Sequence, residues 1–289
     1  MRYGLPWQGS KSRIAEWLVS ILPASHTLVD LFAGGGAVTH CALLSGKWEN
    51  IVMNDATDSA KVFCAAINGE FDGYAVCPAR SEWLEYRDED TAAALMYSFG
   101  NDRTTYLWGE ELEAIKRPAS LMISSPSMWE RYKWYRKFIR AVGEYLEHCD
   151  GKEFAGKNLG RLQNQERLQS LYVLQGLQNL QGLQTDYRFV DIPDGATVYA
   201  DPPYRGTANS SRYGSFDFDA FDEWLAGVDF PVYVSEFDAP RGCVEVASIE
   251  RVGTMSANTT KKYTERLFVQ ERFADAVQVG EPRLFGGGL

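Results

Sequence analysis

Residues 28–38 read Leu-Val-Asp-Leu-Phe-Ala-Gly-Gly-Gly-Ala-Val, a short apolar run followed at once by three glycines. The apolar run is typical of a buried β-strand. Glycines directly after a strand let the backbone turn tightly and approach a ligand that a Cβ would exclude. The spacing is not the G-x-G-x-x-G of dinucleotide sites, and the chain contains no G-x-x-x-x-G-K-[ST] phosphate loop. The stretch therefore predicts a strand, a ligand-binding loop and a helix of an α/β sheet.

A second apolar run, residues 51–53, ends in Asn54-Asp55, about 20 residues beyond the glycines. An acid at the end of the second strand is well placed to accept hydrogen bonds from ribose hydroxyls. A glycine loop with a ribose acid implies an adenosine-containing ligand without a pyrophosphate, and S-adenosylmethionine fits that description. The alternative is a glycine-rich turn beside an unrelated surface aspartate.

A third apolar run, residues 196–200, leads directly into Asp201-Pro202-Pro203-Tyr204. The two prolines fix φ and lack amide donors, which leaves their carbonyl groups as rigid acceptors, and an ionised carboxylate only accepts. Asp201 and the Pro202 carbonyl are therefore suited to hold both N–H donors of an exocyclic amine, while the Tyr204 ring supports a base. The alternative interpretation is a strand that ends in a rigid turn.

Several motifs in this order resemble those of Dam-type DNA adenine-N6 methyltransferases, including the phage-encoded branch. They are Trp7-Gln8-Gly9-Ser10-Lys11, Asp30 to Gly36, Asn54-Asp55 and Asp201-Pro202-Pro203-Tyr204, and the likeness continues through residues 206–209, 231–236 and 256–269. The resemblance implies an S-adenosylmethionine-dependent enzyme. Such an enzyme would flip an adenine out of a specific sequence of double-stranded DNA and methylate its N6 amine.

The resemblance also implies roles position by position. The catalytic residues would be Asp201, Pro202, Pro203 and Tyr204, which hold the flipped adenine. The methyl donor would be bound by Trp7, Lys11, Asp30, Phe32, Gly34, Gly36, Asp55 and Asp201. Lys11 also opens an amphipathic pattern over residues 12–21, so an ordinary helix start is the alternative for this lysine.

Residues 128–140 form the densest basic and aromatic stretch of the chain. At helical spacing the cations share one face, and aromatic and apolar side chains fall on a neighbouring one. The cations are Lys133, Arg136, Lys137 and Arg140, and the apolar set is Trp134, Tyr135, Phe138 and Val142. We expect the apolar set to pack on the domain and the cations to contact DNA phosphates, although a solvated basic face is the alternative. Lys261 and Lys262 are a second candidate phosphate contact, or else a turn after a strand.

Strand-length apolar runs alternate with helical patterns, which predicts a doubly wound, mostly parallel, Rossmann-like methyltransferase sheet. The expected strands are 28–32, 51–53, 187–190, 196–200, 231–235 and 265–270, and the expected helices are 12–21, 37–45, 57–67 and 219–226. We expect residues 1–71 and 185–280 to form the S-adenosylmethionine-binding catalytic domain. Residues 72–184 then form a mainly helical target-recognition insertion, and residues 281–289 a flexible tail.

A Leu-Gln repeat occupies residues 159–184, with leucine recurring every three residues for most of its length. Period 3 matches neither a strand nor a helix, and two internal glycines disfavour a long regular helix. We expect a structural connector, with a helix to about Leu174 followed by turns or a strand.

Composition and charge bear on which other classes of protein the chain could belong to. The chain has 289 residues and a net charge of −10, so DNA binding would depend on local clusters of cations rather than on total charge. No apolar run of membrane-spanning length and no signal-peptide pattern is present, and five cysteines and three histidines show no paired or metal-binding spacing. We expect a monomer or weak dimer without metal in the cytoplasm of a bacterium, encoded by the host or a phage.

Three rival functions remain at this stage. One is methylation of RNA or of a protein amide, against which the basic insertion and the resemblance favour DNA. The Asp-Pro-Pro-Tyr chemistry also serves cytosine-N4 methylation, and a non-catalytic DNA-binding phage remnant would retain the same overall pattern. The order of the motifs and Asp201 favour adenine, and the intact residues 34–36 and 201–204 favour an active enzyme. The chain carries no nuclease motif, which favours a solitary enzyme over one linked to restriction.

Overall fold

A computed structural model describes residues 3–7, 9–68, 70, 76–98, 102–148, 171–174, 179–205, 216–256, 259–276 and 280. The chain divides into two compact units, and each contains a hydrophobic cluster of its own. The first unit comprises Met1–Ser10 and Val62–Gly176, and the second comprises Lys11–Lys61 and Leu177–Leu289.

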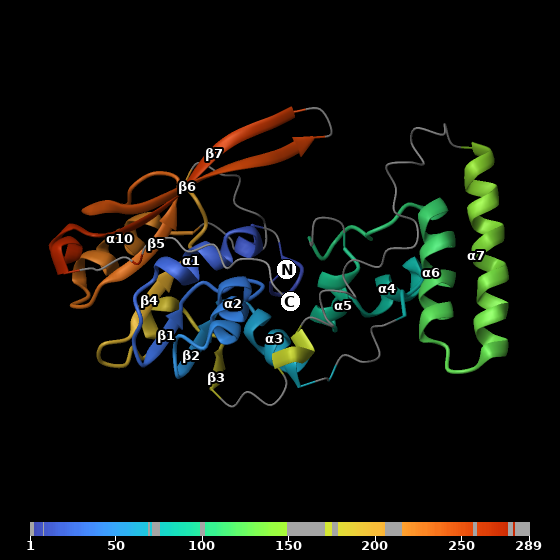
Figure 1. The fold of residues 1–289 in the computed structure, drawn as a ribbon, viewed down its shortest axis with the longest axis horizontal. Helices are drawn as coiled ribbons and strands as arrows, with labels where there is room; N and C mark the ends of the chain where they lie inside the picture. Colours follow the sequence, from blue (N-terminus) through green and yellow to red (C-terminus); the bar gives the residue numbers. More distant parts are fainter. Residues whose placement is uncertain are drawn as a thin grey trace. The chain divides into compact units, whose positions relative to one another are not determined.

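The second unit is built on a seven-stranded sheet of order β3-β2-β1-β4-β5-β7-β6 (Figure 1). The strands are β1 (Thr27–Asp30), β2 (Asn50–Asn54), β3 (Leu180–Leu183), β4 (Thr197–Ala200), β5 (Val232–Glu236), β6 (Cys243–Ser256) and β7 (Thr259–Gln270). The first five in spatial order pair in parallel, whereas β7 runs antiparallel to β5 and β6 antiparallel to β7. The strand order reverses between β1 and β4, the point where open α/β sheets hold their ligands. The predicted doubly wound, mostly parallel sheet is confirmed.

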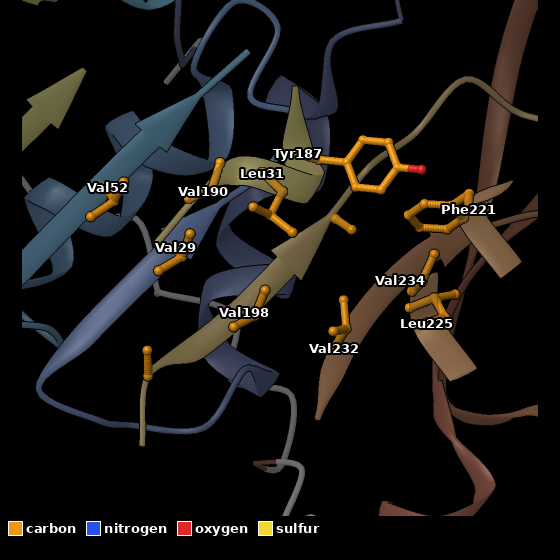
Figure 2. Close-up of a cluster of buried hydrophobic side chains, with 12 residues drawn as sticks. Val29, Leu31, Val52, Tyr187, Val190, Val198, Phe221, Leu225, Val232 and Val234 are labelled. Carbon is orange, nitrogen blue, oxygen red and sulfur yellow. The ribbon is translucent and has the colours of Figure 1, made fainter. Parts of the chain in front are cut away.

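Helices cover both faces of this sheet. Val29, Val198 and Val232 lie on one face and pack against Phe221 and Leu225 of α10 (Phe218–Gly227), as Figure 2 shows. Because side chains alternate along a strand, Asp30 points to the opposite face. There it contacts α2 (Ala37–Ser45), which itself packs against α1 (Ala15–Ile21). A 3-10 turn, η1 (Lys11–Arg13), precedes α1, and another, η6 (Glu271–Ala276), follows β7.

The first unit is mainly helical in its described part, as predicted for the insertion. It contains α4 (Arg80–Tyr86), α5 (Thr91–Met96), α6 (Glu110–Ser124), α7 (Met128–His148) and a 3-10 turn, η4 (Tyr172–Leu174). Helices α6 and α7 lie side by side (Figure 1), joined through buried Ile115 and Tyr145 with Leu112 and Phe138 packed around them. The boundary between the units falls inside α3 (Ser59–Ile67).

One local prediction is wrong. Residues 187–190 are not a strand, because the Asp186 carboxylate accepts the Arg188 amide and bends the chain into the 3-10 turn η5 (Tyr187–Phe189). The end of the Leu-Gln repeat forms edge strand β3, one of the two alternatives expected there. Residues 159–170 and 175–178 of the repeat lie outside the described part. Lys261 and Lys262 lie within strand β7 rather than in a turn, and their side chains lie outside the described part, as does the expected tail at 281–289.

Within the described ranges, no helix is long and apolar enough to cross a membrane. The same ranges contain no group of three or more histidine, cysteine, aspartate or glutamate side chains arranged to hold a metal ion.

Candidate active site

The glycine loop joins β1 to α2 at the point where the strand order reverses. The Leu31 amide donates to the Tyr199 carbonyl of β4, and the Ala33 amide donates to the Asn54 carbonyl of β2, both at 2.9 Å. Gly34 and Gly36 have φ angles of +51° and +70°. A residue with a Cβ adopts this left-handed conformation at a cost of roughly 1–2 kcal/mol, so the turn itself requires glycine at both positions.

Asp55 ties this loop to the end of β2. Its Oδ2 accepts the Gly34 amide at 2.8 Å, and its Oδ1 accepts the amide and the hydroxyl of Thr57 at 2.8 and 2.7 Å. An ionised carboxylate offers about four acceptor positions, so Oδ2 retains capacity for another donor. Asp55 therefore shapes the loop as well as being placed to meet a ligand hydroxyl.

Asp30, at the end of β1, is a buried carboxylate that is only partly satisfied. Its Oδ2 accepts the Thr39 hydroxyl at 2.8 Å, whereas Oδ1 has no hydrogen-bond partner among the described residues. Burial is the main cause that raises the Asp30 pKa to about 7, with smaller contributions from Asp201 and Asp55. A buried acceptor without a donor suits a cationic or N–H-bearing ligand group.

Asp201 directly follows β4, so it lies beside the end of β1. Its Oδ1 is 2.8 Å from the Lys11 ammonium, and that ammonium also lies 4.3 Å from the centre of the Tyr204 ring. The Tyr204 hydroxyl donates to Glu265 Oε2 of β7 at 2.8 Å, and the same oxygen is 3.8 Å from Lys11. Burial raises the Asp201 pKa to about 6, against the lowering effect of Lys11.

A further carboxylate, Glu236 at the end of β5, lies near Asp201. It accepts the amides of Arg205 at 3.1 Å and Phe237 at 2.8 Å, and burial raises its pKa to about 7. The Phe237 ring meets the Tyr204 ring edge to face, with centres 4.5 Å apart. Glu236 and Phe237 thus fix the backbone and ring that follow Pro203.

A family model of D12 class N6 adenine-specific DNA methyltransferases matches residues 7–226, which include the glycine loop and Asp201 to Tyr204. The chain belongs to this family. It is an S-adenosylmethionine-dependent DNA methyltransferase specific for the N6 amine of adenine, as the sequence predicted. A comparison with curated proteins found no match.

The residues of this D12-class methyltransferase fit S-adenosylmethionine. Gly34 and Gly36 carry no Cβ that would block close approach of a ligand to the loop backbone. Asp30 Oδ1 is a buried acceptor without a hydrogen-bond partner among the described residues. S-Adenosylmethionine carries positive charge on its sulfonium and ammonium groups, which matches the acids at this edge of the sheet. When bound, it supplies an activated methyl group.

Two residues predicted to bind the cofactor, Phe32 and Trp7, contact other side chains of the protein. The Phe32 ring packs against Tyr187, Phe216 and Phe221, with centres 5.1 to 5.8 Å apart. Trp7 belongs to the first unit, where the Arg103 guanidinium lies 5.5 Å from its ring. Their assignments to the cofactor stay predictions.

Helix α7 of the D12-class enzyme presents the predicted basic face. Lys133, Arg136, Lys137 and Arg140 are all exposed, and Arg140 pairs with Glu144 at 2.8 Å. Trp134, Phe138 and Val142 are partly buried as expected, but Tyr135 is 47% exposed. Tyr135 therefore lies on the solvent side of α7 and not on the face that packs against α6.

Sequence reasoning missed Thr39, Glu236 and Glu265. Thr39 follows the loop by one helical turn, and Glu236 ends a strand, so both positions could have been inferred from the sheet. Glu265 lies in a segment that resembles the family, but its contact with Tyr204 depends on strand β7 pairing with β5, which no local pattern indicates.

Proposed function

We propose that Asp201, the Pro202 carbonyl and the Tyr204 ring hold an adenine flipped out of double-stranded DNA. The observation that carries this assignment is the adjacency of Asp30 and Asp201 at the reversal of strand order, since β1 and β4 pair in parallel. That adjacency brings the predicted cofactor loop and the predicted amine acceptors to one edge of the sheet.

The chain's own residues act on the amine by orientation. The N6 lone pair of adenine is delocalised into the ring, which makes the nitrogen a poor nucleophile. Acceptors on both N–H groups favour pyramidal geometry and restore lone-pair character. Asp201 serves as a hydrogen-bond acceptor and need not remove a proton before transfer, and Pro203 keeps the turn rigid.

The methyl donor would be held by the glycine loop and the surrounding acids. Gly34 and Gly36 permit close backbone approach, Asp30 accepts from a donor group, and Asp55 accepts from a ribose hydroxyl. Trp7, Phe32 and Lys11 complete the cofactor set proposed from the resemblance. The support for this set is the unsatisfied Oδ1 of Asp30 and the positive φ of both glycines.

DNA would be held by the insertion, residues 72–184, between catalytic segments 1–71 and 185–280. The exposed cations of α7 support this part of the proposal, with Lys261 and Lys262 as a second phosphate contact. We further propose sequence-specific recognition by a monomer or weak dimer, a cytoplasmic location and a solitary role, in a bacterium or a phage.

The test is methyl transfer from tritiated S-adenosylmethionine into DNA amplified in vitro, which carries no methylated base, followed by nucleoside analysis. We expect label in N6-methyladenine. Asp201→Ala should abolish transfer while cofactor binding is largely kept, and the exposed Asp191→Ala serves as the matched control. Label in N4-methylcytosine, or unchanged turnover of Asp201→Ala, would contradict the assignment.

A further inference from the structure

The Lys11 ammonium contacts two of the groups that the proposed function gives to the target adenine. It lies 2.8 Å from Asp201 Oδ1, and it lies over the Tyr204 ring at 4.3 Å from the ring centre. The proposed function gives both of these partners to adenine: the carboxylate accepts from N6, and the ring stacks on the base. Lysine and the target amine therefore compete for one place.

Lys11 cannot simply leave this place for water. Its side chain is 7% exposed, and an ammonium without a counter-charge is costly in a buried site. The nearest alternative partner is Glu265, whose Oε2 is already 3.8 Å from the ammonium and whose side chain is 6% exposed. A small rotation of the lysine would exchange Asp201 for Glu265.

Glu265 is also fixed in a suitable position. Its Oε2 accepts the Tyr204 hydroxyl at 2.8 Å, and burial together with nearby carboxylates raises the Tyr204 pKa, so the phenol keeps its proton and donates. Strand β7 holds Glu265 next to its last pair with β5, Glu236 with Arg266, and Glu265 itself pairs with Ile249 of β6. The acceptor is thus in place before the base arrives.

We propose that Lys11 occupies the place of the target amine while no base is bound, and that Glu265 is the positioning residue that receives the lysine when the base enters. This inference rests on the proposed role of Asp201 and Tyr204. It assigns Glu265 no contact with the reacting atoms. Glu265 acts through Lys11 by making the release of Asp201 less costly, and it holds Tyr204 flat beneath the base.

The first experiment compares single-turnover methyl transfer into in vitro amplified DNA, at saturating S-adenosylmethionine, in wild type, E265Q, K11M and the double variant. Among the described residues, E265Q leaves Lys11 with Asp201 as its one charged partner. Transfer therefore slows by about tenfold to a hundredfold while the DNA Kd stays unchanged. In K11M no ammonium needs a second partner. There, E265Q removes one of the two carboxylates that Lys11 contacts in the wild type, and transfer stays equal or rises.

This change of sign separates displacement from a structural role, which would slow transfer in both backgrounds. Equal slowing in both backgrounds would overturn the proposal. Complete loss of transfer in a folded K11M that still binds S-adenosylmethionine would overturn it too, because Lys11 would then be needed while the base is bound. If wild type itself transfers no methyl group to adenine, the proposed function fails instead.

A second variant, Lys11→Arg, tests the displacement without changing Glu265. Its result therefore does not depend on whether E265Q folds. The guanidinium of Lys11→Arg binds a carboxylate through two parallel hydrogen bonds and would hold Asp201 more firmly than lysine does. Transfer by Lys11→Arg should therefore be slower than transfer by Lys11→Met. The opposite order, with both proteins folded by circular dichroism, would overturn the displacement.

Discussion

Buried carboxylates dominate this site at the scale of single residues. Asp30, Asp201 and Glu236 all have pKa values raised chiefly by burial, to about 7, 6 and 7. A site that holds several acids away from water is poorly stabilised when empty and well suited to a cationic ligand. The charge of Asp201 raises the pKa values of both Asp30 and Glu236, so these groups titrate together. Measurements in solution would therefore report pKa values that belong to the group of acids and not to single residues.

Methyl transfer should lose activity as pH falls through about 6. Burial raises the pKa of Asp201 to about 6, so acid protonates this acceptor. The neutral carboxyl group accepts a hydrogen bond from the amine more weakly than the carboxylate does, and its O–H is a competing donor. The measurement is the single-turnover rate against pH at saturating cofactor and DNA. A rate that stays constant down to pH 5 would contradict the acceptor role of Asp201.

Asp30→Asn should stabilise the cofactor-free protein and weaken cofactor binding. The folded-state pKa of Asp30, about 7, lies above the ordinary value of 3.8. The folded state therefore binds more protons between these limits, and its stability falls as pH rises through this range. Asparagine carries no charge at any pH, so it removes the cost of keeping a buried carboxylate ionised. We expect a gain of about 2 kcal/mol at pH 8, after allowing for an amide donor left without a partner.

Urea unfolding at pH 5 and pH 8, with calorimetric titration of S-adenosylmethionine, measures both effects. The exposed Asp191→Asn is the matched control and should change neither. A loss of stability in Asp30→Asn at pH 8 would show that the carboxylate is better satisfied than its unpaired Oδ1 indicates.

At the scale of elements, the sequence predicted those parts whose signals are local. The strands at Thr27–Asp30 and Thr197–Ala200 are short apolar runs followed by glycine or proline, and α2 begins at the residue predicted from the sequence. At Leu180–Leu183 the sequence left turns or a strand open, because the parallel pairing of this edge strand with β2 uses backbone groups, which a Leu-Gln repeat does not specify. Residues 187–190 look like a strand, but the side chain of Asp186 determines the turn.

The residues of the candidate site also separate into those predictable from local sequence and those that are not. Asp30, Asp55 and Asp201 could be predicted because each stands at the end of a strand in a recognisable motif. The contact of Lys11 with Asp201 joins residues that are 190 positions apart in the sequence. The contact of Tyr204 with Glu265 depends on where β7 lies in the sheet. Both require the assembled sheet, which no local sequence pattern contains.

Gly36→Ala should destabilise the glycine loop and weaken cofactor binding. Gly36 precedes α2 with φ of +70°, where a Cβ costs roughly 1–2 kcal/mol. Relief of that strain would move the Gly34–Asp55 contact, so the affinity for S-adenosylmethionine should fall along with Tm.

Gly143→Ala is the control: it lies inside α7 with nothing within 4 Å of an added Cβ, and should raise helix stability by up to about 1 kcal/mol. Equal effects of the two substitutions would contradict the requirement for a left-handed residue.

At the scale of the whole molecule, a net charge of −10 must be reconciled with a polyanionic substrate. Long-range attraction to DNA is weak for such a protein, so affinity has to come from a local surface. In the described part of the chain, α7 offers that surface, because Lys133, Arg136, Lys137 and Arg140 are exposed on one helix. Family membership establishes DNA as the substrate, and α7 is our proposal for where its phosphates lie.

Replacing these four cations of α7 with glutamine should weaken DNA binding and reduce its salt dependence. Each phosphate contact contributes about −0.9 to the slope of log Kobs against log salt concentration, so the slope should become less negative by about 3 to 4. Binding to amplified DNA over a range of salt concentrations measures this change. The matched control replaces four exposed cations elsewhere, Arg13, Lys61, Arg188 and Arg241, and alters total charge equally. If both variants shift the slope by the same amount, total charge governs binding and α7 is not the DNA-contacting surface.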